Sequence, residues 1–252
     1  MYNESYELMT AAAVKKVDFL KKNPTGYILL SIIAGAFIGL GVMIMSVTGA
    51  FASGTPYVKL AMGAVFASAL SLVVMAGGEL FTGNNMSVFA GFLRKKVSAG
   101  DMLRLWAVCF AGNWAGSLLI AGLFLAANIP SDAVGDFMVL SSLAKVSMGP
   151  AVLFARAVFC NIMVCLGVWC TFRCKSESGK LIMIFWCILI FVACGGEHTV
   201  ANMTMLTVGL AKGGIAVSGY FYNILLAAIG NIVGGALCIA LPYHLIGKEK
   251  NN

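Results

Sequence analysis

Charged residues are scarce in this chain, and so are histidine and proline. Asp, Glu, Lys and Arg make up 11% of its 252 residues, against 60% hydrophobic residues, two histidines and five prolines. So little charge excludes an ordinary soluble globular protein. No cysteine pair has CxxC spacing and no histidines cluster near the eight cysteines, so neither a disulfide nor a metal site is expected. We interpret the cysteines as small packing residues of membrane helices.

Long apolar runs are what the sequence has instead. A run of about 20 residues crosses about 30 Å of hydrocarbon. The first long run follows a polar segment and is too long for a signal-peptide core, so we expect a retained span. The chain is predicted to be one all-α transmembrane domain over residues 1–252. Four runs have 21–23 residues: Tyr27–Val47, Leu105–Ala127, Ala151–Phe172 and Gly219–Leu241.

Two further apolar regions stop short. Leu60–Met75 ends at "AGGELFTGNNM" (76–86), and Leu181–Cys194 ends at "GGEHTVANM" (195–203). A second short apolar piece follows each of these polar stretches. We interpret both regions as helices that break inside the membrane and restart, near Asn84 in the first case and near Val200 in the second.

The two breaks belong to an internal repeat. The Gly-Gly-Glu at 77–79 matches that at 195–197 at an offset of 118, and "GNWAG" (112–116) matches "GNIVG" (230–234) at the same offset. The Asn-Met at 85–86 matches that at 202–203 at an offset of 117, and Pro24 matches Pro150 at 126. Six transmembrane helices are thus predicted in two three-helix repeats, at about 24–127 and 150–242. Because three is odd, the second repeat is expected to be inverted.

Basic residues predict how the chain is oriented. With the N-terminus inside, thirteen of the seventeen Lys and Arg lie in cytoplasmic segments, Lys248 and Lys250 among them. Lys59, Lys145 and Lys212 lie on the other side, and Arg156 lies within a span. This bias predicts a multi-pass protein of the inner (plasma) membrane with both termini in the cytoplasm. The net charge of +7 therefore reflects topology, and nucleic acid is not an expected partner.

An inverted repeat with a broken helix in each half is typical of transporters with a site near the bilayer midplane. Unwound backbone persists there only against protein or a water-filled path. The first N–H groups of each restarted half-helix carry partial positive charge, which favours an anion. The sequence therefore predicts a path for a small anion.

The break motifs, with "FCNIMVCLGVW" (159–169) and "GNIVGG" (230–235), resemble the formate/nitrite transporter family, which includes hydrosulfide channels. The likeness covers Lys16 to about Pro242. It implies an aquaporin-like fold, a homopentamer in the lipid bilayer, and a pore in each protomer. The family usually has Phe directly before the Glu-His pair, where this chain has Gly196, a change that would loosen the second break.

The resemblance also implies roles for individual residues. Phe66 and Leu70 would form the cytoplasmic constriction, and Leu80 with Phe191 the outer one. Thr82 and His198 would lie between the two constrictions.

Further polar residues of this chain match family positions near the pore. Asn161 and Asn231 are candidates to hold the imidazole, with packing between helices as the other interpretation of Asn231. Lys145 would concentrate anions at the outer vestibule. We expect Glu79 and Glu197 to stabilise the breaks by capping backbone N–H groups, since a free carboxylate would repel an anion.

These residues suggest proton-linked passage of a weak-acid anion, formate or nitrite. A histidine with an ordinary pKa of ~6.5 suits lending a proton to the anion. The alternative is that His198 only donates a hydrogen bond.

Other classes of protein remain as alternatives. One is a hydrosulfide channel. A second is an aquaporin-like neutral-solute channel, although the prolines, at 24, 56, 130, 150 and 242, fall in neither break. An enzyme is not expected because the HExxH pattern is absent and no cysteine has a paired base, and no cofactor is expected either.

Overall fold

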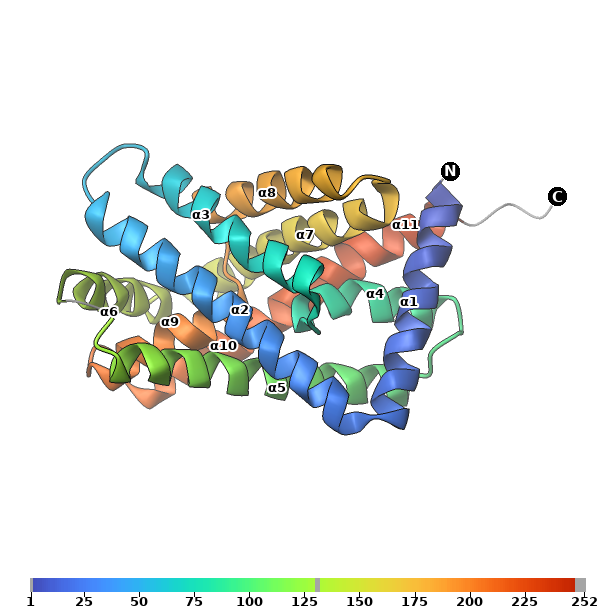
Figure 1. Ribbon diagram of the computed structural model, residues 1–252, viewed down its shortest axis with the longest axis horizontal. Coiled ribbons are helices and arrows are strands. Elements are labelled where there is room, and N and C mark those ends of the chain that lie inside the picture. Colours follow the sequence, from blue (N-terminus) through green and yellow to red (C-terminus); the bar gives the residue numbers. More distant parts are fainter. Residues whose placement is uncertain (1, 130–131, 248–252) are drawn as a thin grey trace.

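The computed structural model of the protein describes residues 2–129 and 132–247, and every regular element that these residues form is a helix. Pro130, Lys248 and Lys250, named above, lie outside them. Long helices run side by side along the longest axis of the molecule, and α1 crosses one end of them (Figure 1). The helices are α1 (Tyr2–Lys22), α2 (Pro24–Phe51), α3 (Val58–Leu72), α4 (Phe81–Leu93), α5 (Ala99–Ala126), α6 (Asp132–Val146), α7 (Pro150–Arg173), α8 (Glu177–Ala193), α9 (Thr199–Ala211), α10 (Val217–Ile232) and α11 (Leu241–Ile246), with π-type segments η1 (Val73–Gly77) and η2 (Val233–Ala240).

Within the described residues, five helical stretches are long and apolar enough to cross a membrane. The remaining predicted region, Leu181–Cys194 with the short apolar piece after its break, is divided between the 17-residue helix α8 and the shorter apolar helix α9. Several of these helices extend by a few residues beyond the apolar runs of the sequence, because the adjoining polar residues are also helical. The five stretches are Pro24–Phe51, Val58–Gly77, Ala99–Ala126, Pro150–Arg173 and Val217–Ile246.

Both predicted breaks exist, and they have the same backbone form. Gly77 (φ +89°) and Gly195 (φ +77°) adopt the left-handed conformation that favours glycine. The chain is extended at Leu80 and at His198, after which the half-helices α4 and α9 begin. The first restart is at Phe81, three residues before the predicted Asn84, and the second is at Thr199, directly before the predicted Val200.

Two buried asparagines hold the breaks together. The Asn113 side chain accepts a hydrogen bond from Phe81 N (2.8 Å) and donates to the carbonyl oxygens of Ser31 (2.7 Å) and Glu79 (2.8 Å). It thereby provides the partner that fixes the early restart of α4. An isolated N–H in hydrocarbon would cost several kcal/mol.

Asn231 makes the same three bonds in the second half, at positions displaced by the repeat offsets. It accepts from Thr199 N (2.9 Å) and donates to the carbonyl oxygens of Ala157 (2.8 Å) and Glu197 (3.0 Å). Phe81 and Thr199 are related by 118, and Ser31 and Ala157 by 126. The offsets measured in the sequence therefore correspond to equivalent contacts.

Glycines allow the long helices within each half to approach closely. A Cβ atom on Gly116 of α5 would overlap the carbonyl oxygen of Ile32 on α2, and one on Gly234 of η2 would overlap that of Val158 on α7. Gly122, also on α5, has open space around it. Side-chain size at 116 thus sets the distance between α2 and α5, and with it the position of Asn113.

We expect Gly116→Ala to destabilise the protein, because its methyl group would collide with backbone that cannot rotate away. Overpacking of this kind costs about 2–3 kcal/mol, and the melting temperature in detergent should fall by about 5–10 °C. Gly122→Ala on the same helix is the matched control and should leave the melting temperature unchanged or slightly raised. Equal melting temperatures for the two variants would contradict this account.

We expect Asn113→Leu to cost about 3 kcal/mol, since it leaves buried backbone groups at the break without partners. Asn231→Leu should cost a similar amount, because the two side chains make equivalent bonds. Ser53→Ala, at an exposed position between α2 and α3, serves as the control. Thermal unfolding of the three purified variants measures the difference, and a shift at Asn113 no larger than that at Ser53 would refute the role of the asparagine.

Candidate functional site

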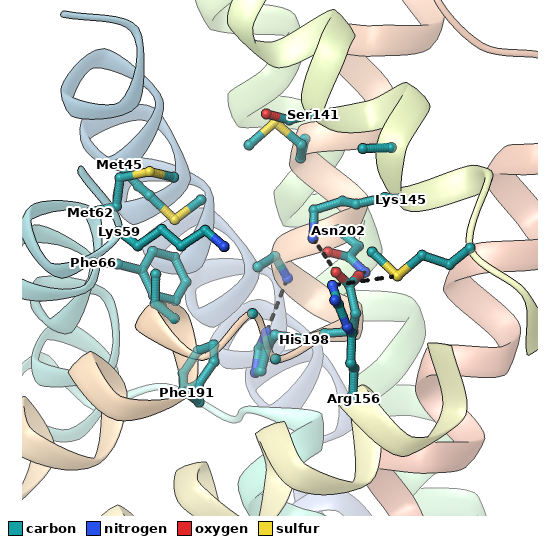
Figure 2. Close-up of a pocket in the computed structure, with 18 residues that line it drawn as sticks. Met45, Lys59, Met62, Phe66, Ser141, Lys145, Arg156, Phe191, His198 and Asn202 are labelled. Atoms are coloured by element: carbon teal, nitrogen blue, oxygen red, sulfur yellow. Dashed lines mark hydrogen bonds and ion pairs between the residues drawn. The ribbon is translucent and has the colours of Figure 1, made fainter. Parts of the chain in front are cut away.

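Two cavities approach each other from opposite sides of the breaks. The first, the Lys145 cavity, has about 230 Å³ and is lined by Lys59, Lys145, Arg156, Glu197 and Asn202, among others (Figure 2). The second, the Lys16 cavity, has about 330 Å³ and is lined by Lys16, Glu79, Asn84 and Ser87, with several apolar residues.

Between the two cavities lies a chamber of about 10 Å³. This volume is about that needed by the centre of one water molecule. The chamber walls are apolar except for His198. Because the chamber is so small, the path between the two cavities is closed. Its lining residues are Ile38, Phe66, Leu70, Leu80, Val164, Ile188, Phe191 and His198.

The four predicted constriction residues all line this chamber, but they pair differently from the prediction. Phe66 and Phe191 border the Lys145 cavity, with their rings edge to face and their centroids 6.0 Å apart. Leu70 and Leu80 border the Lys16 cavity. The predicted grouping of Phe66 with Leu70 was wrong, because a full helical turn along the path separates residues i and i+4 of α3.

His198 and Thr82 come from opposite halves of the chain and are in contact beside the chamber, which His198 lines and Thr82 does not. The Nε2 atom of His198 is 3.0 Å from Thr82 Oγ1, and both side chains are buried. The imidazole lies nearly parallel to the Phe191 ring, with 24° between the planes. These contacts place one imidazole nitrogen next to the closed path.

The other imidazole nitrogen acts as a helix cap. His198 is the N-cap residue of α9, and its Nδ1 accepts a hydrogen bond from the backbone N–H of Ala201 (3.1 Å). An atom that accepts this bond carries no proton. In the neutral ring the proton therefore lies on Nε2, which donates to Thr82 Oγ1.

The side chains of Asn161 and Asn231 form no hydrogen bond with the imidazole, contrary to the prediction. Asn161 donates to the carbonyl oxygens of Thr82 (3.1 Å) and Asn231 (2.6 Å). Asn231 binds the backbone on both sides of His198, at Thr199 N and at the Glu197 carbonyl oxygen, whereas Asn161 links the backbone of Thr82 to that of Asn231. Backbone groups in a break need partners that regular helix does not require, and the spacing of residues gave no sign of this need.

Glu197 also differs from the prediction, because it binds side chains and not backbone N–H groups. Its carboxylate, 3% exposed, lies 2.8 Å from Lys145 Nζ and accepts from Asn202 Nδ2 (2.7 Å). Lys145 thus lies in the cavity wall at the end of α6, where the sequence places a vestibule lysine, with its ammonium group paired.

Glu79 repeats this arrangement in the Lys16 cavity. Lys16 Nζ lies 2.9 Å from Glu79 Oε2, and Asn84 Nδ2 donates to the same oxygen (2.9 Å). Tyr27 adds a third partner for Glu79 at 3.2 Å. Glu79 therefore caps no backbone N–H either.

Sequence analysis missed Lys16, Asn84 and Asn202 as site residues. The repeat offset of 118, which relates the two Gly-Gly-Glu motifs, also relates Asn84 to Asn202. Continuing that offset past the motifs would have identified these two asparagines as equivalent. The match at 117 paired Asn202 with Asn85 instead, whose side-chain amide is buried and has no hydrogen-bond partner among the described residues.

The space at Gly196 is filled, so the expected loosening of the break is not seen. A Cβ atom on Gly196 would lie 3.0 Å from Cys160 Cβ and 3.1 Å from Phe191 Cδ2. Phe191 and the α7 helix therefore close this side of the break without the family's usual aromatic residue.

Comparison with known proteins agrees with this geometry. The family model described as "Formate/nitrite transporter" matches residues 3–245. The nitrite transporter NirC of Escherichia coli is 34% identical, with 100% of this chain and 94% of NirC covered. A solved FNT family ion channel has a TM-score of 0.89 at 32% identity, covering 96% of this chain and 98% of that one. A pentameric formate channel with formate bound has a TM-score of 0.78 at 29% identity, covering 90% and 98%. This chain is thus a multi-pass membrane protein that belongs to the formate/nitrite transporter family.

Proposed function

We propose that this protein is a channel, and not an enzyme, for small monovalent weak-acid anions, with formate or nitrite as its substrate. The observation that carries the proposal is that two lysine-bearing cavities lie on either side of a narrow apolar chamber whose polar wall residue is His198. Two similar proteins support the substrate class, one named a nitrite transporter and the other a formate channel with formate bound.

The apolar pairs around the chamber favour passage of the neutral acid. A bare anion in an apolar medium without a partner loses solvation worth tens of kcal/mol. Protonation of an anion whose acid has a pKa of about 4 costs about 4 kcal/mol at pH 7. The cheaper route is therefore for the anion to acquire a proton before it crosses the leucine and phenylalanine pairs.

The cap at His198 supports the hydrogen-bonding alternative over a proton relay. A relay requires the doubly protonated imidazolium as the acid, because a neutral imidazole that lost Nε2–H would become an imidazolate. The imidazolium has a proton on Nδ1, where the Ala201 N–H already points. Two N–H groups cannot face each other at 3.1 Å without the ring or the helix moving. We propose that His198 stays neutral and donates Nε2–H to the passing substrate in place of Thr82, while the transported proton comes from the aqueous cavity.

We also propose a homopentamer in the plasma membrane, with both termini in the cytoplasm. The solved formate channel is a pentamer. The two ends of the described chain lie together, because Arg94 donates to Asn3 Oδ1 (2.8 Å) and to the Gly247 carbonyl oxygen (3.2 Å). Both ends therefore lie on one side, and the excess of lysine and arginine predicts that this side is the cytoplasm.

Proteoliposomes containing a pH dye test the function. An inward gradient of formate or nitrite should acidify the lumen rapidly, and the initial rate should rise as the external pH falls, since the fraction of neutral acid rises about tenfold per pH unit. Protein-free vesicles provide the background rate. A rate equal to that background for both anions would refute the proposed function.

Two substitutions at His198 separate the two roles of the imidazole. Asn retains both an acceptor for Ala201 N–H and an N–H donor but cannot titrate, whereas Leu retains neither group. We expect His198→Asn to conduct more slowly than wild type with an unchanged pH profile, and His198→Leu to lose at least about tenfold in rate. A pH profile that flattens in His198→Asn would instead establish the proton relay.

A further inference from the structure

The two cavities have the same lysine, glutamate and asparagine cluster but differ in net charge. The Lys16 cavity has one cation and one carboxylate, Lys16 and Glu79, and these are paired. The Lys145 cavity has one carboxylate, Glu197, and three cations, of which only Lys145 lies in an ion pair within the described residues. The remaining two cations, Lys59 and Arg156, give this cavity a net charge of about +2.

Arg156 in the second half and Leu30 in the first half occupy equivalent positions but have different side chains. The backbone carbonyl oxygen of Arg156 accepts from Glu197 N at 3.2 Å, and that of Leu30 accepts from Glu79 N at the same distance. Leu30 lines the Lys16 cavity and Arg156 lines the Lys145 cavity. The hydrogen bond to the break thus comes from a backbone carbonyl oxygen in both halves, and it does not require the guanidinium group.

The side chains of Arg156 and Lys59 are directed toward the Lys145 cavity. In Figure 2, Arg156 extends from α7 toward Lys145, and the amine of Lys59 points in from α3 on the opposite wall. Arg156 Nη1 has a contact with Met148 Sδ at 3.9 Å, and no carboxylate of the described residues forms an ion pair with either side chain. The guanidinium thus retains most of its five N–H donors for another ligand.

We propose that Arg156, with Lys59 across the cavity, forms a capture site for oxyanions with two oxygens on one central atom. The guanidinium fork matches such an O–X–O group through two parallel hydrogen bonds, which a spherical anion such as hydrosulfide cannot form. A cavity of about 230 Å³ accommodates an anion of three or four heavy atoms together with water.

This site would select formate and nitrite over hydrosulfide before either enters the constriction. The inference rests on the proposed function and specifies the substrate class of the same path. It assigns to Arg156 a role separate from that of Lys145, whose ammonium group is already bound to Glu197. Lys59 contributes charge without a fixed geometry, since the ammonium of lysine acts as a point charge.

The test compares the half-saturating concentrations for formate and for hydrosulfide in proteoliposomes. Arg156→Leu introduces the residue that the other half has at this position, and we expect it to raise the value for formate and nitrite about tenfold, with a change below about threefold for hydrosulfide. Arg156→Lys keeps the charge and loses the fork, so it should also reduce the preference for formate. Arg104→Leu, an exposed position on α5 outside both cavities, is the matched control.

Each result has one interpretation. Unchanged values in both Arg156 variants, or equal losses for formate and hydrosulfide, would overturn the oxyanion site. Arg156→Lys preserves size and charge, so it provides the answer if Arg156→Leu fails to assemble. If wild-type protein conducts none of the three anions, the proposed function fails first and the capture site fails with it.

Discussion

Backbone groups that lack hydrogen-bond partners inside a bilayer are the constraint on which this structure depends. A transport path through a helical bundle needs interrupted helices, and each interruption exposes N–H and C=O groups that lipid cannot satisfy. In this protein one asparagine in each half satisfies the groups next to the break, and small residues on the long helices bring that asparagine close enough. Without this arrangement the two half-helices could not begin beside the chamber.

The separation of charged side chains from the apolar chamber follows from the same constraint. Ionised groups lie in the two cavities, where each glutamate is bound by a lysine and an asparagine. The chamber between the cavities has only one polar side chain in its wall, and that imidazole is itself tied to the helix that it caps. Charged side chains therefore lie on both sides of the narrowest part, whose own wall has none. This arrangement underlies our proposal that an anion acquires a proton before it crosses.

The near symmetry of the two halves makes their differences informative. Lys16 and Lys145, Glu79 and Glu197, and Asn84 and Asn202 form equivalent clusters around the two breaks. His198 has no counterpart of its type, because the equivalent residue of the first half is Leu80, and both are the residue before a restarted helix. At these two equivalent positions, only the second half of the chain therefore provides a polar side chain, the imidazole of His198, to the chamber wall. The same comparison between halves distinguishes Arg156 from Leu30.

The sequence alone was sufficient for the membrane class, the repeat and both breaks, because hydropathy and repeat offsets are properties of the chain itself. The candidate path residues came from the resemblance to a family, and that list lacked Lys16, Asn84 and Asn202. An ionisable residue such as His198 within a membrane-spanning region also indicates a function, since burying it there is costly.

Only the tertiary structure decided which residues act together. Phe66 pairs with Phe191, and Leu70 pairs with Leu80. Residues four apart on α3 lie about one helical turn apart along the path, so Phe66 and Leu70 border different cavities. Glu79 and Glu197 bind lysines from other helices, and Asn161 and Asn231 hold backbone instead of the imidazole. Apart from Leu70 and Leu80, which are ten positions apart on either side of the first break, these pairings join residues from about 30 to more than 100 positions apart. They arise from how the helices pack and are not encoded in any local pattern.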